Sequence, residues 1–267
     1  MRRHSVSRWF GVIGLTLALV GLVSQGTARA QTLTETRQKA DEGDATAQFN
    51  LGYMYATGDG VPQDDAQAVV WVRKAADQGL AAAQLNLGGM YAAGRGVPQD
   101  VAQAVSWYRK AADQGLGDAA FNLGFMYATG QGVPQDDAQA VVWIRKAGDQ
   151  GHVAAQISLG FRYATGQGVP QDDAQAGAWY RKAAEQGRAS AQFNLGGMYA
   201  TGRGVPRDYV EAHKWNSLAV SRATGDAQKQ YAQNRDVLAQ LMTRAQIAEA
   251  QQRVAEWQAD FEQREAE

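Results

Sequence analysis

The sequence contains no cysteine and only three histidines among its 267 residues. The absence of cysteine excludes a disulfide framework, a thiolate metal site and a cysteine nucleophile. One histidine, His4, lies in the first thirty residues, and the other two, His152 and His213, occupy unrelated places in the pattern described below. We therefore expect no metal site and no cofactor.

Basic charge is also scarce outside the N-terminal segment. Residues 1–30 contain four arginines and no acidic residue, so the rest of the chain holds 22 basic and 27 acidic side chains. Nucleic-acid binding depends on clustered Lys and Arg that neutralise phosphates, and attachment to anionic membranes depends on polybasic segments. The charge balance argues against both classes of partner.

Residues 1–30 have the pattern of a cleaved signal peptide. Arginines precede an apolar run from Trp9 to Val23, and Ala28-Arg29-Ala30 follows as a cleavage-site pattern. The run is about 15 residues long, short of the roughly 20 that span a bilayer, although an uncleaved anchor is the alternative interpretation. We predict export by the general secretory route to the periplasm, with secretion as the alternative and no membrane span after cleavage.

The few prolines reveal an internal repeat. All five recur at intervals of 36 residues, and so do five of the seven tryptophans. The positions are Pro62, Pro98, Pro134, Pro170 and Pro206, and Trp71, Trp107, Trp143, Trp179 and Trp215. A strict period of this length is typical of a solenoid.

Each unit reads as two antiparallel helices. Apolar residues at helical spacing predict a first helix over about residues 46–57. It ends before Gly58, because glycine readily adopts the left-handed conformation that terminates many helices. Pro62 interrupts the chain, and Asp64 with Gln67 forms a capping-box pattern that starts the second helix. We expect Trp71 and its equivalents to fill the space between neighbouring units.

Two strings carry a family resemblance: A-Q-F-N-L-G-x-M-Y-A-T-G-x-G-V-P-Q-D and A-x-x-W-x-R-K-A-A-x-Q-G. They resemble the SEL-one-like repeat (SLR) family, a relative of the tetratricopeptide repeat. The resemblance implies an all-α fold, a right-handed α-solenoid whose concave face binds proteins or peptides, and scaffolding rather than catalysis. Some exported SLR proteins are associated with β-lactam binding or hydrolysis, but those relatives carry a cysteine pair in each repeat.

The predicted function is therefore a non-catalytic scaffold or adaptor in the bacterial envelope that binds a protein or peptide. A secreted module that engages a host or neighbouring cell is the alternative, and a β-lactamase-like hydrolase is disfavoured by the missing cysteines. The predicted organisation is a signal peptide at 1–30, a capping half-repeat at 31–44, repeats at 45–80, 81–116, 117–152, 153–188 and 189–225, and capping helices at 226–267.

The last predicted helix carries apolar residues at alternating spacings of three and four. These are Ile247, Ala250, Val254, Trp257 and Phe261. Since the final unit of a solenoid needs a polar outer surface, we interpret the helix as a lid on the last repeat. A dimerisation or partner-binding helix is the alternative, although we expect a monomer.

The concave face is where partner binding is expected. If the unit superposes on the tetratricopeptide pattern, Phe49, Asn50 and Tyr53 point toward the groove. The Tyr53 position varies through Gly89, Phe125, Phe161 and Gly197. Its aromatic rings either form pockets for a peptide's apolar side chains or fill the groove by stacking on the next helix. The candidate partner-binding residues are Phe49, Asn50, Tyr53, Asn86, Asn122, Phe125, Phe161 and Asn194.

The asparagines of this set form a polar ladder. Their amides either hold the backbone of an extended peptide or, as we favour, bond the backbone of a neighbouring repeat. The variable loop positions, which are Asp59, Arg95, Gln131, Gln167 and Arg203, are expected to be solvated. The Gly-x-Gly loops and paired aspartates are interpreted as turns and helix caps, not as phosphate or metal sites.

Overall fold

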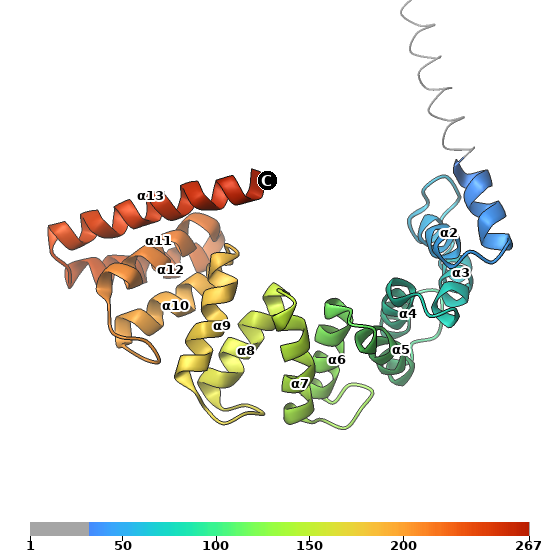
Figure 1. Cartoon of the computed structure of the whole chain (residues 1–267), viewed down its shortest axis with the longest axis horizontal. Helices are drawn as coiled ribbons and strands as arrows, with labels where there is room; N and C mark the ends of the chain where they lie inside the picture. The colour runs from blue at the N-terminus through green and yellow to red at the C-terminus, as the bar shows by residue number, and fades with distance from the viewer. Residues whose placement is uncertain (1–31, 267) are drawn as a thin grey trace, which may run out of the picture. The chain divides into compact units, whose positions relative to one another are not determined.

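The computed structural model describes residues 32–266, and every regular element in that range is an α-helix (Figure 1). A helix over residues 32–41 comes first. It is followed by α2 (Ala45–Thr57), α3 (Asp65–Asp77), α4 (Ala81–Ala93), α5 (Val101–Asp113), α6 (Gly117–Thr129), α7 (Asp137–Asp149), α8 (Val153–Thr165), α9 (Asp173–Glu185), α10 (Ala189–Thr201), α11 (Tyr209–Arg222), α12 (Gly225–Gln240) and α13 (Arg244–Ala266). The predicted signal peptide and its cleavage site lie outside the described residues.

The helices from α2 to α11 alternate between two kinds, each recurring every 36 residues. We call α2, α4, α6, α8 and α10 the A helices, and α3, α5, α7, α9 and α11 the B helices. The prediction of an all-α solenoid built from helix-turn-helix repeats is confirmed.

The predicted start and stop signals act as expected. The Asp64 carboxylate accepts a hydrogen bond from the backbone N–H of Gln67 at 3.0 Å, and the equivalent aspartates of the other B helices make the same type of contact. Each A helix ends at a left-handed glycine, for example Gly58 with φ of 78°. These caps satisfy backbone groups that a helix end leaves free, so the boundaries follow from local sequence.

The chain divides into two compact units, the first of which ends at Ala111. In this unit α2 packs on α3 and α3 packs on α4. One buried cluster joins Val69 and Val72 of α3 to Leu87 of α4 and Trp107 of α5. Trp71 packs against a second cluster that includes Ala40 of the helix over residues 32–41. The tryptophans thus connect one repeat to the one before it, as predicted.

The second unit runs from Ala112 and contains α6 to α13. Each helix from α6 to α11 packs on the next along the chain. Trp179 of α9 lies against Gly148 of α7, where a Cβ would come within 3.2 Å of the indole ring. The same Cβ would lie 2.8 Å from Cδ1 of Leu159, so α7 packs closely on both α8 and α9 at this point.

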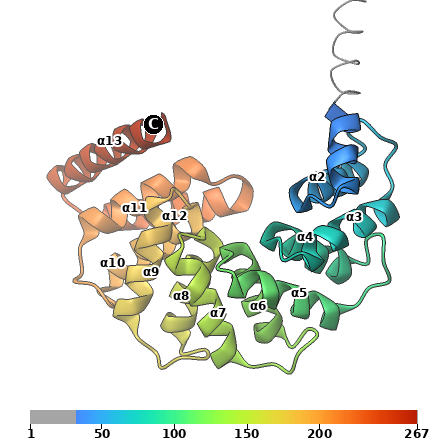
Figure 2. The same ribbon diagram turned by 45° about the vertical axis from the view of Figure 1, so that its right-hand side comes forward.

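The helices α12 and α13 lie beside α11 in both views of the chain (Figures 1 and 2). Trp257 of α13 contacts Trp215 of α11 edge to face, with ring centroids 6.2 Å apart. Tyr231 of α12 stacks on Phe193 of α10 at 4.3 Å. Since α13 uses its apolar face inside the chain, the packing favours a lid over a partner-binding helix.

Among residues 32–266, no helix combines the length and apolar character needed to cross a bilayer.

Candidate protein-binding surface

The A helices have a buried face and an exposed face that differ sharply. One leucine of each, namely Leu51, Leu87, Leu123, Leu159 and Leu195, is fully buried. Two residues later, Tyr53, Phe125 and Phe161 are 58%, 48% and 53% exposed. Residues two apart on a helix point in nearly opposite directions, so the leucine and the aromatic residue occupy opposite faces. We call the aromatic side the exposed register.

This exposure bears on the two interpretations of the aromatic residues. A ring that filled the groove by stacking on the next A helix would be largely covered. About half or more of the accessible surface of each of the three residues remains open to solvent. The structure therefore favours the interpretation in which the rings are available to a partner.

The other predicted binding residues lie in different environments. Asn50 and Asn86 are exposed, whereas Asn122 and Asn194 are half-buried. The amide of Asn86 donates to the carbonyl of Ala82, one turn earlier in the same helix, at 3.0 Å. The expectation that each asparagine bonds a neighbouring repeat is therefore wrong for Asn86, whose amide bonds a carbonyl of its own helix.

Phe49 differs from the other candidate aromatics. It is half-buried and packs against the cluster formed by α3, α4 and α5. Part of its ring therefore belongs to the core of the first unit, and Tyr53 is the more accessible aromatic residue of α2.

Three of the five variable loop residues, Arg95, Gln167 and Arg203, are not simply solvated, contrary to expectation, because each bonds an aspartate of the preceding repeat. Arg95 pairs with Asp65 at 2.9 Å and Arg203 pairs with Asp173 at 2.8 Å, in each case reaching the first turn of the preceding B helix. The reason is a close backbone approach, since a Cβ on Gly204 would lie 2.1 Å from the carbonyl oxygen of Asp173. Because the second glycine of the loop has no side chain, the loop can lie directly against the backbone of the previous repeat.

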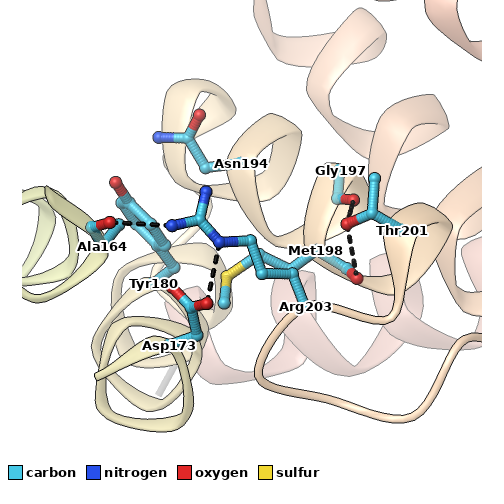
Figure 3. Close-up of a pocket in the computed structure, with 8 residues that line it drawn as sticks. All are labelled: Ala164, Asp173, Tyr180, Asn194, Gly197, Met198, Thr201 and Arg203. Carbon is cyan, nitrogen blue, oxygen red and sulfur yellow. Dashed lines mark hydrogen bonds and ion pairs between the residues drawn. The ribbon is translucent and has the colours of Figure 1, made fainter. Parts of the chain in front are cut away.

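The ion pair of Arg203 lies in a pocket of about 340 Å³ at the junction of the fourth and fifth repeats (Figure 3). Arg203 donates from Nε to Asp173 and from Nη2 to the carbonyl of Ala164, both at 2.8 Å. The hydrogen bond from Nε of Arg203 and the positive charge of Arg203 lower the pKa of Asp173. We call this the polar pocket, and it is lined by Ala164, Asp173, Tyr180, Asn194, Gly197, Met198, Thr201 and Arg203.

A second pocket, of about 250 Å³, adjoins the first along α10. It shares Gly197 and Thr201 with the polar pocket. We call it the apolar pocket, and it is lined by Phe193, Gly197, Ala200, Thr201, Asn216, Asn234, Val237 and Leu238. Within the described residues, the buried Oδ1 of Asn216 has no hydrogen-bond partner.

Sequence reasoning missed a set of glutamines that join the repeats. The amide of Gln186 donates to the carbonyl of Gly151 at 3.1 Å and to Oε1 of Gln156 at 2.9 Å. Gln156 is buried and donates in turn to the carbonyl of Gly148 at 3.1 Å. The recurrence of Ala-Gln at the start of the A helices and of Gln-Gly after the B helices was the available signal.

A second missed contact uses the arginine near the end of each B helix. Arg73 donates to the hydroxyl of Tyr91 in the next A helix at 2.5 Å, and Arg181 makes the equivalent bond to Tyr199. The sequence suggested only that a cation suits this end of a helix. The structure shows that it also joins successive repeats.

The two histidines of the described residues lie at unrelated places in the repeats. His152 caps α8, where its Nδ1 accepts from the N–H of Ala155 at 3.1 Å, and its ring stacks on Phe121. His213 is buried in α11, and burial lowers its pKa. Over residues 32–266, no group of three or more His, Asp or Glu side chains is arranged to hold a metal ion.

The model of the Sel1 repeat family matches the chain five times, at residues 45–80, 81–116, 117–152, 153–187 and 189–222. No curated protein shows significant similarity to the chain.

Two solved structures resemble the chain closely. One is a protective antigen present in uropathogenic Escherichia coli strains, described as displaying an SLR fold, with 40% identity and a TM-score of 0.73. The match covers 83% of this chain but only 50% of that one, so this chain spans about half of that protein's length. The other is a Sel1 repeat protein from Oxalobacter formigenes, with 33% identity, a TM-score of 0.71, and coverage of 80% of this chain and 88% of that one.

Proposed function

Because the chain belongs to the Sel1 repeat family, we propose that it is an exported, non-catalytic scaffold that binds a protein partner in the bacterial envelope. Proteins with Sel1 repeats are generally protein-interaction modules. The partner contacts the exposed register of the A helices.

The observation that carries this proposal is the exposure of Phe125 and Phe161 in successive A helices, α6 and α8. Large aromatic side chains are costly to leave in water, and tyrosine, tryptophan and phenylalanine are enriched in the cores of protein interfaces. Tyr53 holds the same register in the first unit. The half-buried Asn122 and Asn194 supply amides beside this register that can hydrogen-bond to a peptide backbone.

The envelope location rests on the signal-peptide pattern of residues 1–30. Cell fractionation with an antibody to the folded repeats tests it. We expect a periplasmic pool whose N-terminus is Gln31. A pool found only in the culture supernatant would favour a secreted binding module, and a cytoplasmic pool with residues 1–30 intact would contradict export.

The binding surface is tested by photo-crosslinking from intact cells. A photoreactive amino acid replaces Phe125 or Phe161 in separate variants, and a third variant carries it at Val142. Val142 is a suitable control because it is 49% exposed, similar to Phe125, but lies on the B helix α7.

We expect the probes at Phe125 and Phe161 to capture the same protein, and the probe at Val142 to capture none of it. Equal capture from all three positions would show that the exposed register is not selective. Capture from Val142 alone would move the binding surface to the B helices.

A further inference from the structure

We propose that the fifth repeat binds the C-terminal residue of a partner protein, with its carboxylate in the polar pocket and its apolar side chain in the apolar pocket. The inference rests on the proposed function, since Gly197 occupies the exposed register in α10. It goes beyond that function by naming the part of the partner that the fifth repeat binds, a C-terminal residue.

The polar pocket offers hydrogen-bond donors. A guanidinium carries five N–H groups, and the ion pair with Asp173 and the bond to Ala164 use only part of them. The Arg203 side chain is 50% exposed, and the Asn194 amide and the Tyr180 side chain also line the pocket (Figure 3). A carboxylate fits this set because it accepts several hydrogen bonds and pairs with guanidinium.

The neighbouring charge does not cancel these donors. The Asp173 carboxylate accepts from the Nε of Arg203 through Oδ2, whereas its Oδ1 is buried and has no hydrogen-bond partner within the described residues. The Nη1 group of Arg203 takes part in neither of its two bonds, so its N–H groups are the donors that an incoming carboxylate would use. Since the pocket carries one positive and one negative charge, hydrogen bonds rather than net attraction supply the affinity.

The apolar pocket accounts for the choice of a C-terminal residue. Phe193, Val237 and Leu238 line it, and Val237 is 57% exposed. The two pockets meet at Gly197 and Thr201. At the end of a chain, the carboxylate and the side chain leave the same Cα, so one residue reaches both pockets. An internal Asp or Glu has its carboxylate on the side chain and cannot fill both at once.

Gly197 leaves this site open. Three other repeats carry an aromatic residue at the same position, whereas a Cβ built on Gly197 meets no atom within 4 Å. The loop that follows carries arginine only in the two repeats with glycine, as the pairs Gly89 with Arg95 and Gly197 with Arg203. Only the fifth repeat is followed by α12, which supplies Val237 and Leu238.

The test is an NMR titration of the purified, isotope-labelled protein with three peptides. They are acetyl-Ala-Ala-Leu with a free carboxylate, the same peptide as its amide, and acetyl-Ala-Glu-Ala amide with an internal carboxylate. We expect the free acid to shift the signals of Gly197 and Thr201 and to bind at least about tenfold more tightly than either other peptide, the loss expected from removing a charged hydrogen bond.

Two variants test the two halves of the site. Arg203→Gln introduces the residue found at position 167, where the glutamine still bonds the aspartate of the previous repeat. Val237→Asp places a negative charge in the apolar pocket. We expect each variant to bind the free-acid peptide at least about tenfold more weakly, because each disrupts one of the two contacts, the carboxylate site or the apolar site.

The matched controls are Arg207→Gln, which makes the same charge change four residues later, and Leu241→Asp, which alters an exposed apolar residue outside the lining. Both should bind like the unaltered protein. Equal binding of acid and amide, unchanged binding by Arg203→Gln, absence of binding, or equal binding of the internal glutamate would overturn the inference. Crosslinking from Phe161 would persist in each case if the proposed function alone is correct.

Discussion

The buried and exposed faces of the A helices differ in how much their residues vary from one repeat to the next. On the buried face the same leucine recurs five times, from Leu51 to Leu195, and each copy is fully enclosed. On the exposed register the residue changes between tyrosine, phenylalanine and glycine. Close packing tolerates little change in volume, whereas a solvent-exposed position has no fixed neighbours to satisfy. Variation between repeats of one chain therefore marks the surface that is free to serve binding.

The largest effect is expected where one repeat packs on the next. Trp179→Ala removes a buried indole that lies against Gly148, and we expect a loss of about 3–5 kcal/mol in the free energy of unfolding. Chemical denaturation measures it. A loss no greater than that of an exposed substitution would mean that the indole does not hold α7 and α9 together.

The two faces of one helix provide a direct contrast. Leu159→Ala should lower the free energy of unfolding by about 2–5 kcal/mol, because it leaves a cavity in a fully packed site. Phe161→Ala, two residues later, should change it by at most about 0.5 kcal/mol, as is usual for exposed positions. Thermal melts of the two variants compare them, and similar destabilisation by both would refute the division into two faces.

A smaller effect is expected from the polar contacts between repeats. Gln156→Ala removes the donor to the carbonyl of Gly148 and one of the two acceptors of the Gln186 amide, which keeps its bond to the carbonyl of Gly151. The loss should cost about 1–3 kcal/mol. Gln175→Ala removes an exposed glutamine and serves as the control in the same denaturation series. Equal stability of the two variants would show that the buried bonds are replaced by water.

The smallest effect concerns pH. Burial lowers the pKa of His213, which lies near Ser217 and close to the charges of Arg235 and Asp236. The unfolded chain therefore takes up a proton more readily than the native protein does. The free energy of unfolding should fall as the pH drops through the ordinary range of histidine.

The control for this effect is His213→Gln, which has no titrating group at this position. Melting temperatures between pH 8 and pH 5 should decline less steeply in the variant than in the unaltered protein. Identical slopes would assign the decline to other groups.

The helix boundaries could be predicted closely because their causes are local. A capping aspartate, a left-handed glycine and a proline act within a few residues of their own position. The role of Arg203 could not, because it depends on how closely one loop approaches the preceding B helix. The prediction for Asn86 failed for the opposite reason, since a local carbonyl displaced the expected partner in another repeat.

The sequence by itself determined the solenoid, since a 36-residue period with alternating helix signals leaves few other ways to bury the recurring leucines and tryptophans. It also identified the exposed register, through variation within one chain. Only the tertiary structure decided that the fifth repeat has two pockets that meet at Gly197. The polar pocket forms where a loop meets the previous repeat, and the apolar pocket forms between α10, α11 and α12. Each combines side chains that the sequence separates by roughly 40 residues.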